Sequence, residues 1–224
     1  MTMTLYSGPL SMFGAKAEIA LREKAIPFDL VLVPFDMQRL YEPKHPEVTR
    51  INPKRQVPVL VDGDVEIFDS TQIFEYLDHL RPDPALWPAS PAGRAEARLI
   101  EHLSDEVYFP PIIRLMGLQD RPEDPLAVAA RDAAKAACHR FEQLIGEGDY
   151  LAGAYSYADI AFFMAQLFGE RMGATLGPDT PRLMAWRLRM GLRPAVRAVV
   201  GPMLQYLRGQ GRPIPAPFQH ISPT

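Results

Sequence analysis

The sequence predicts a small α+β domain followed by a domain of helices alone. Strand-like and helix-like segments alternate over residues 1–81, whereas helical periodicity without a convincing strand follows from residue 92. Between them, four prolines at positions 82, 84, 88 and 91 interrupt the periodic pattern. We therefore expect a first domain over residues 1–81, a linker over 82–91, a helical domain over 92–208 and a proline-rich tail over 209–224.

The first domain is expected to follow the order β-α-β-(α)-β-β-α. A short strand at 4–6, a helix at 13–24 and a strand at 28–33 come first, and a short helix at 47–51 follows a proline-rich connection. Asp62-Gly63 suits a tight turn, so it predicts a hairpin between strands at 59–61 and 65–68. A helix at 70–80 completes a small mixed sheet covered by helices.

The second domain shows helical periodicity in five stretches: 92–118, 125–146, 157–173, 181–191 and 194–208. Ser156-Tyr157-Ala158-Asp159 precedes an apolar run and forms a capping box with Asp in place of Glu, which predicts a helix start with a buried face. Pro110-Pro111 should kink or break the first of these helices. The tail is expected to be mobile or laid along the surface.

Composition narrows the function. A net charge of −3 argues against nucleic-acid binding through a broad basic field. The single cysteine, Cys138, excludes an internal disulfide framework and a Cys-x-x-Cys site, and the five histidines show no ligand spacing, so we expect no metal. The chain starts without a secretory signal and has no apolar run of about 20 residues. We expect a cytoplasmic protein with no membrane part.

The stretch around Val57-Pro58 is typical of a peptide-docking edge. Pro58 opens an apolar strand-like run, and a cis bond before it would turn the backbone N–H and C=O of Val57 outward, toward an extended peptide. Asp69-Ser70 comes where the next strand ends and a helix begins, which sets a carboxylate and a hydroxyl beside free helix N–H groups. Together they predict a site for a small peptide.

The order of these motifs resembles the cytosolic glutathione transferase family, over nearly the whole chain up to about Leu207. The resemblance depends on four pieces at suitable spacing: Leu5-Tyr6-Ser7 with Ser11-Met12-Phe13, Asn52-Pro53 through Gln56-Val57-Pro58, Asp69-Ser70 through Tyr76-Leu77, and Ser156 to Ala161. It implies a thioredoxin-like first domain, a helical second domain, glutathione as co-substrate and, usually, a homodimer.

The family's chemistry is activation of the glutathione thiol, whose pKa near ~8.5 leaves little thiolate at neutral pH. The resemblance to serine-type members implies that Ser11, just before the first helix, donates a hydrogen bond to the sulfur. Ser11 could instead be only a helix cap. Met12 stands where the family often has proline. Ser7 and Tyr6 are weaker alternatives, a turn residue and a half-buried strand residue respectively.

The resemblance also implies a set of binding residues. Val57, before a cis Pro58, would pair its backbone with the cysteinyl part of glutathione, and Gln56 could meet the glycyl end. Asp69 and Ser70 would receive the γ-glutamyl end, although the family more often has Glu before this serine. The second substrate is expected against Phe13, with Tyr108 and Arg114 as further candidates beside Phe109 and Met116, where a core role is the alternative for such a stripe.

Two function classes remain open at this stage. The first is a glutathione transferase that conjugates the thiolate to small apolar electrophiles, with a role in detoxification, or that carries out a related glutathione-dependent reduction or cleavage. The second is a non-catalytic interaction or regulatory protein on the same fold, for example of the stringent-starvation or cell-division type. The arginine-bearing stretch 182–197 and the tail, as a possible protein contact, favour the second class.

Overall fold

The computed structural model describes residues 2–221, which form two compact units. The first unit contains the chain up to Pro84 together with Pro194–Pro213, and the second contains Ala85–Arg193 with Ile214–Ile221. The sequence places 194–208 in the helical domain. In the structure helix α9 (Pro194–Gly209) packs instead on α1 (Met12–Glu23). Periodicity identifies this helix but carries no information about its packing partner.

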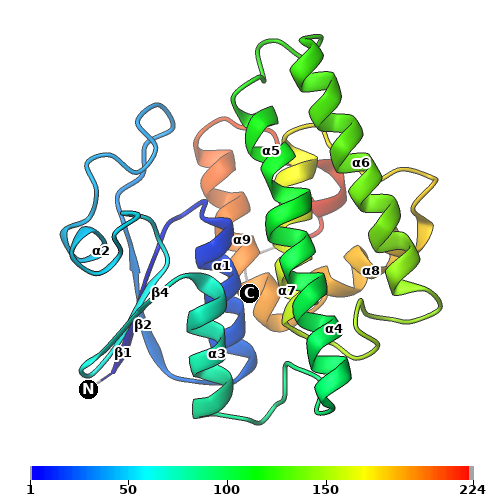
Figure 1. The fold of residues 1–224 in the computed structure, drawn as a ribbon. Helices are drawn as coiled ribbons and strands as arrows, with labels where there is room; N and C mark the ends of the chain where they lie inside the picture. The colour runs from blue at the N-terminus through cyan, green and yellow to red at the C-terminus, as the bar shows by residue number, and fades with distance from the viewer. Residues whose placement is uncertain (1, 222–224) are drawn as a thin grey trace. The chain divides into compact units, whose positions relative to one another are not determined.

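The first unit contains a four-stranded mixed sheet in the order β2-β1-β3-β4 (Figure 1). Strand β1 (Met3–Ser7) runs parallel to β2 (Phe28–Leu32) and antiparallel to β3 (Val59–Asp62), which pairs in turn with β4 (Val65–Phe68). Gly63 turns the β3–β4 hairpin at φ +60°, a backbone conformation that glycine adopts without strain. The thioredoxin-like architecture that the sequence predicts is confirmed.

Helices cover both faces of this sheet (Figure 1). Helix α1 packs with α3 (Ser70–Leu80) on the face that buries Leu5 and Leu60. Helix α2 (Pro46–Ile51) contributes to a cluster of Val33, Val48 and Val59 on the other face, and Tyr6 packs against this cluster. Because side chains alternate along a strand, Tyr6 and Leu5 point to opposite faces.

A buried lysine ties the ends of α1 and α3 together. The Lys24 ammonium is fully buried and donates to the carbonyls of Arg81 (2.8 Å) and Pro84 (3.0 Å), and it pairs with the Asp78 carboxylate at 2.8 Å. The Arg81 guanidinium returns hydrogen bonds to the carbonyls of Lys24 and Ala25. Paired and hydrogen-bonded in this way, the charge is tolerated in the interior.

The second unit is built around α7 (Tyr157–Arg171), nearly all of whose residues are buried. Around it lie α4 (Pro91–His102), a π-helical turn η1 (Leu103–Tyr108), α5 (Phe109–Met116), α6 (Pro125–Ile145) and α8 (Pro181–Gly191). Pro110 and Pro111 lie in the first turn of α5, where the missing N–H groups cost little. The winding of the helix changes instead in the π-helical turn η1, which ends just before Phe109.

The predicted capping box at the start of α7 is confirmed. The Ser156 N–H donates to the Asp159 carboxylate at 2.9 Å, and the same carboxylate accepts from the Leu151 N–H and the Trp186 indole N–H, both at 2.9 Å. One short side chain therefore joins the α6–α7 connection, the start of α7 and the middle of α8. Burial raises the pKa of Asp159 to about 6, against the hydrogen bonds that lower it.

Residues 214–221 of the tail belong to the helical unit. Phe218 is fully buried, with its ring 5.8 Å from that of Phe163 and 5.6 Å from the Arg187 guanidinium. Ile221 is also buried. Of the two expectations for this segment, the surface-laid one describes residues 214–221. Within residues 2–221 no helix has both the length and the apolar character that crossing a membrane requires.

Candidate functional site

The strand register brings the predicted glutathione-binding segments to one end of the sheet. Tyr6 on β1 is opposite Val59 on β3, and Val59 is opposite Phe68 on β4. The turn after Ser7, which leads to Ser11, leaves the sheet at this end, Val57-Pro58 enters it there, and Asp69-Ser70 leaves it there. All three segments belong to the first unit. Segments more than 60 positions apart in the sequence therefore lie at the same end of the sheet.

Ser11 caps the N-terminus of α1 and keeps a proton to donate. Its Oγ accepts a hydrogen bond from the Gly14 N–H at 3.0 Å, and the residue is 8% exposed. A hydroxyl can accept and donate at the same time, so the cap leaves the O–H free for an anion at the helix N-terminus. The partial positive charge of that terminus favours the same anion. Cap and catalytic group are thus compatible roles here.

Ser7 provides a second hydroxyl beside the first. It is the last residue of β1 rather than part of the turn, and it is 2% exposed. A methyl group added at Gly14 would lie 2.0 Å from the Ser7 Oγ and 3.1 Å from the Ser11 Oγ, so both hydroxyls border the bare backbone of the helix N-terminus. Tyr6 instead has its ring 5.2 Å from that of His45, among the packed residues of the α2 face.

The Val57–Pro58 peptide bond is cis, as the sequence predicts. The loop before it is held by Asn52, whose contacts no local sequence pattern predicts. The buried Asn52 amide donates to the Gln56 carbonyl at 2.6 Å and accepts from the Lys54 N–H at 2.9 Å. Pro58 is buried and Val57 partly buried, whereas the Gln56 side chain is exposed. Asn52 thus fixes the backbone that presents Val57.

Asp69 and Ser70 begin α3 in an unusual conformation. The Asp69 carboxylate accepts from the N–H groups of Thr71 and Gln72, at 3.0 and 3.3 Å, through one oxygen. Its φ of 77° lies in the region that favours glycine, and non-glycine residues held there cluster at functional sites. Asp69 is exposed and Ser70 is 3% exposed. The pair matches the predicted N-cap and leaves the carboxylate open to solvent.

The three predicted second-substrate residues belong to different units. Phe13 lies on α1, half-buried, 5.4 Å from the Lys16 ammonium. Tyr108 and Arg114 belong to the helical unit. The Tyr108 ring is fully buried and packs edge-on against Phe162, at 5.2 Å between centroids, whereas Arg114 is exposed. Tyr108 is therefore part of the core of its unit. Cys138, whose pKa burial raises to about 12, is equally a core residue.

A cluster of aromatic rings that the sequence does not reveal lies at the same end of the sheet. A methyl group at Gly8 would lie 2.3 Å from the Tyr41 ring, so this ring rests on the turn that leads to Ser11. The Phe35 ring is 4.7 Å from that of Tyr41 and 6.0 Å from that of Tyr206 on α9. All three side chains are partly exposed. They form an apolar wall from residues far apart in sequence.

The described residues contain no group of three His, Cys, Asp or Glu side chains that could hold a metal ion. The groups that the structure places at this end of the sheet include the Ser7 and Ser11 hydroxyls, the Asp69 carboxylate and aromatic rings. Such groups recognise a short zwitterionic peptide and can stabilise an anion on it.

Comparisons with known proteins identify the family of both parts of the chain. The glutathione S-transferase N-terminal domain model matches residues 5–85, and the C-terminal domain model matches residues 105–194. A solved glutathione S-transferase from Methylobacillus flagellatus KT with glutathione bound superposes with a TM-score of 0.76 at 25% identity, covering 88% of this chain and 98% of that one.

Curated relatives fall into two groups. Glutathione S-transferase F10 of Arabidopsis thaliana is 29% identical over 89% of this chain and 96% of its own. A stringent starvation protein A homolog of Coxiella burnetii is 35% identical, but the match spans only 48% of each chain. FtsZ-localized protein A of Caulobacter vibrioides is 26% identical over 88% of this chain and 90% of its own. Two of these three names describe no transferase activity.

The two domain models, in their expected order, cover most of the chain, and two relatives match it over 88–89% of its length. The chain belongs to the glutathione S-transferase family.

Proposed function

We propose that this protein binds glutathione at the Ser11 end of its sheet and activates the thiol for attack on small apolar electrophiles. The observation that carries the proposal is the convergence of Ser11, the Val57–Pro58 edge and Asp69-Ser70, which the strand register brings together. Each segment alone has a purely structural explanation. Their position at the same end of the sheet provides a backbone pairing site, an anion site and a hydroxyl donor, which are the groups that a tripeptide such as glutathione requires.

Activation would depend on the two features at the start of α1. A hydrogen bond from the Ser11 hydroxyl to sulfur stabilises the thiolate by about 1.5–3 kcal/mol, as for bonds to charged groups generally. Since each ~1.4 kcal/mol moves a pKa by about one, this lowers the thiol pKa from near ~8.5 to about the neutral range. The helix N-terminus adds a smaller contribution of the same sign.

The remaining groups would orient the peptide. The Val57 backbone, held by Asn52, would pair with the cysteinyl residue, and Gln56 would lie toward the glycyl end. The exposed Asp69 carboxylate would face the γ-glutamyl ammonium, and the Ser70 side chain, at the positive end of α3, would face its carboxylate. The N–H groups of Thr71 and Gln72 are already bonded to Asp69. The aromatic wall of Phe35, Tyr41 and Tyr206 then offers a surface of matching chemistry for an apolar electrophile beside the sulfur.

The test compares Ser11→Ala with Ser90→Ala. Ser90 caps α4 with the same geometry, since its Oγ accepts from the Gly93 N–H at 3.1 Å, so both variants lose a similar helix cap. Ser11→Ala should leave calorimetric glutathione binding within about threefold of the wild type and lower kcat/KM for a chloronitrobenzene acceptor about 10–100-fold, in line with the lost hydrogen bond. Ser90→Ala should change neither.

The absence of measurable heat at millimolar glutathione in the wild type would reject glutathione binding altogether. Binding without turnover, unaffected by Ser11→Ala, would instead favour the second candidate function, a regulatory protein that retains the fold. The names of the Coxiella burnetii and Caulobacter vibrioides relatives favour that candidate. A cytoplasmic location suits either role, because glutathione is kept reduced there.

A further inference from the structure

The arginines of the last part of the chain are not balanced by acidic residues nearby in sequence. From Thr180 to the C-terminus there are seven arginines and no aspartate or glutamate, although the whole chain has a net charge of −3. Three of these arginines, Arg182, Arg187 and Arg189, lie in α8. Each of these three forms an ion pair with an acidic residue from elsewhere in the chain, and the pairs of Arg182 and Arg189 lie at the surface.

Helix α8, together with the residue that caps its C-terminus, Leu192, also exposes a line of large apolar side chains. Met184, Leu188 and Leu192 are 38%, 54% and 67% exposed and follow one another at intervals of four residues. Residues at this spacing share one face of a helix, so the three form a continuous strip, which we call the α8 ridge. Contiguous exposed apolar surface with polar residues at its border marks interaction sites.

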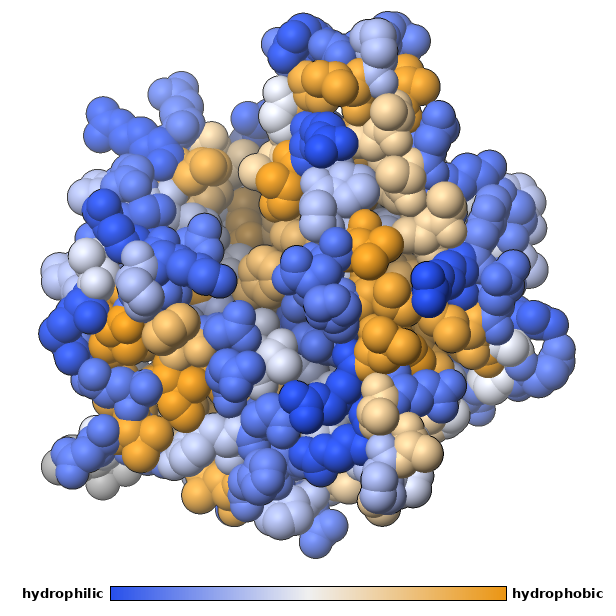
Figure 2. Space-filling model, in the orientation of Figure 1, coloured by the Kyte–Doolittle hydropathy of each residue, from blue (hydrophilic) through white to orange (hydrophobic). Residues whose placement is uncertain are grey.

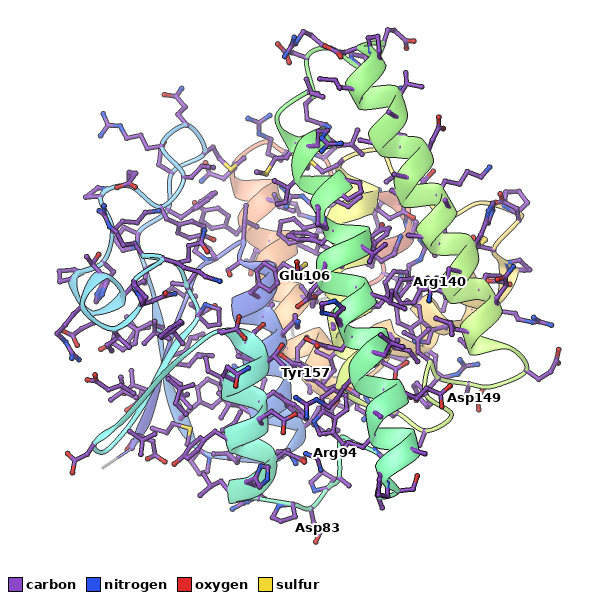
Figure 3. The ribbon with its side chains drawn as sticks, viewed as in Figure 1. Asp83, Arg94, Glu106, Arg140, Asp149 and Tyr157 are labelled. Carbon is purple, nitrogen blue, oxygen red and sulfur yellow. The ribbon has the colours of Figure 1, made fainter. Side chains whose placement is uncertain are left out.

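Arg182 and Arg189 border the α8 ridge. They pair with Glu147 (2.6 Å) and Asp149 (2.8 Å) from the α6–α7 connection, where Asp149 is labelled in Figure 3. The side chains of Glu147 and Asp149 are 93% and 72% exposed, and ion pairs so open to solvent contribute little. A carboxylate arriving from outside can therefore replace either partner at small cost.

The inner side of α8 is anchored firmly. The Trp186 indole donates to the buried Asp159, and Arg187 forms a buried ion pair with Glu170. At the C-terminal end of the helix, a methyl group on Gly191 would lie 3.1 Å from the His220 ring and 3.2 Å from Ile221, so the tail closes directly over it. The ridge is thus held on a rigid support, which reduces the entropy lost on binding.

We propose that the α8 ridge, with Arg182 and Arg189 beside it, docks an acidic amphipathic helix of a partner protein. Apolar side chains at intervals of four fit the groove between the side chains of a second helix. The arginines select a partner that carries carboxylates next to its apolar strip. A two-fold contact between copies of this chain would oppose the same arginines, which disfavours self-association here. This proposal is independent of glutathione turnover.

The test uses a fluorescent synthetic helical peptide of about 18 residues, long enough to form helix alone. It carries Leu at i, i+4, i+7 and i+11 with Glu beside them, and two control peptides replace either Leu by Ser or Glu by Lys. We expect the full-length protein to bind the first peptide at least about tenfold more tightly than either control, with weaker binding as salt increases.

Matched protein variants locate the contact. Leu188→Ser with Leu192→Ser, and separately Arg189→Ser, should weaken peptide binding by about fivefold or more. Leu126→Ser on α6 is the control for the two leucines, since Leu126 is 60% exposed. Arg121→Ser is the control for the arginine, with a side chain that is 61% exposed against 35% for Arg189. Both controls should leave binding unchanged. Glutathione binding should be the same in all of these variants, which separates this proposal from that of the Ser11 site.

Three outcomes would overturn the proposal. The first is equal binding of the acidic and the Lys-substituted peptides. The second is equal loss of binding in the α8 and the α6 variants, which would indicate non-specific adhesion. The third is no peptide binding together with evidence for another occupant. That evidence would be a dimer mass in sedimentation that the double variant Leu188→Ser with Leu192→Ser halves, or binding to vesicles of anionic lipid that the same double variant abolishes. Those results would assign the ridge to a second copy or to a membrane surface.

Discussion

Asn52 shows how one buried amide can set the shape of a binding edge. Its side chain joins the Lys54 N–H and the Gln56 carbonyl, and its own carbonyl accepts from the Arg55 N–H at 2.7 Å. Arg55 between them has a φ of 55°, so the loop needs this support to keep a strained residue in place. These contacts set the direction of the Val57 backbone.

Replacing Asn52 should therefore loosen the edge that meets glutathione. Asn52→Ala loses two buried hydrogen bonds, so we expect the free energy of unfolding to fall by about 2–3 kcal/mol and the Kd for glutathione to rise about tenfold or more. Lys54→Ala, in the same loop but exposed, should change neither, because only its backbone is used. Urea unfolding and calorimetry measure the two effects, and an unchanged Kd in folded Asn52→Ala would contradict the role.

For Tyr108, in contrast to Asn52, we predict that loss of the polar group costs little stability. Its ring is fully buried, and its hydroxyl lies beside the Cys138 thiol, which is only a weak hydrogen-bond partner. Its pKa lies well above the ordinary value, mainly because of burial. Among the residues that the structure describes, the hydroxyl has no stronger partner, so Tyr108→Phe should change the free energy of unfolding by no more than about 1 kcal/mol in either direction.

Two further measurements test whether Tyr108 is a core residue or part of the second-substrate site. Gly169→Ala should be strongly destabilising, because the added methyl group would lie 1.9 Å from the Tyr108 hydroxyl. Glutathione turnover in Tyr108→Phe should equal that of the wild type. A loss of turnover above about tenfold, with stability intact, would return Tyr108 to the second-substrate site that the sequence suggested.

At the scale of residues, the sequence predicts groups that act through their type and position in the chain. Ser11, Asp69 and Ser70 follow strands and precede helices, so their capping geometry is readable from order alone. Asn52 and the wall of Phe35, Tyr41 and Tyr206 are different. Their contacts join loops and helices as far apart as residues 35 and 206, which no local pattern shows.

Among the elements, α7 depends most on a single side chain. Asp159 is buried and accepts from Leu151, Ser156 and Trp186, so it connects three segments of the helical unit. Asp159→Asn puts an amide N–H₂ where a donor already points. We expect the free energy of unfolding at pH 7 to fall by about 1–3 kcal/mol, the cost of an unsatisfied buried group. Asp120→Asn, whose carboxylate is 83% exposed, is the control.

Asp159 should also make the free energy of unfolding depend on pH, with a sign that follows from its raised pKa. Its pKa in the folded chain is about 6, above the unfolded value of 3.8, so the folded state binds the proton more tightly. The stability that Asp159 contributes through protonation is present below about pH 4 and is lost as pH rises to about 6, by about 3 kcal/mol. Urea unfolding across this range should show a smaller decline in Asp159→Asn, and equal slopes would contradict the assignment.

At the scale of elements, periodicity predicts helices better than it predicts their surroundings. The boundaries of α6, α7 and α8 lie within about two residues of expectation, which is the usual uncertainty of helix ends. The π-helical turn of η1 lies ahead of Pro110 and Pro111, within the stretch that the sequence predicts as one helix. Its i→i+5 bonding leaves no period in the sequence that separates it from α-helix.

For the whole molecule, exposed apolar surface is the best guide to assembly. Besides the α8 ridge, the helical unit exposes Leu99, Val107 and Ile113, at 54%, 46% and 46%, along α4, η1 and α5, where Figure 2 shows apolar side chains gathered. A homodimer is expected from the family resemblance. Formation of a homodimer would cover an exposed apolar face of this kind. We propose this face as the contact between two copies.

Charge placed in the middle of this face should separate the copies. Val107→Glu introduces a carboxylate that a dimer would have to bury opposite its own copy, so it should raise the dimer Kd by about 100-fold or more. Leu126→Glu, on α6 and 60% exposed, is the matched control. Sedimentation equilibrium should give the wild type and Leu126→Glu twice the mass of the chain and Val107→Glu the mass of one chain at micromolar concentration. A wild-type mass of one chain, or a dimer that Val107→Glu leaves intact, would show that α4, η1 and α5 do not form the contact.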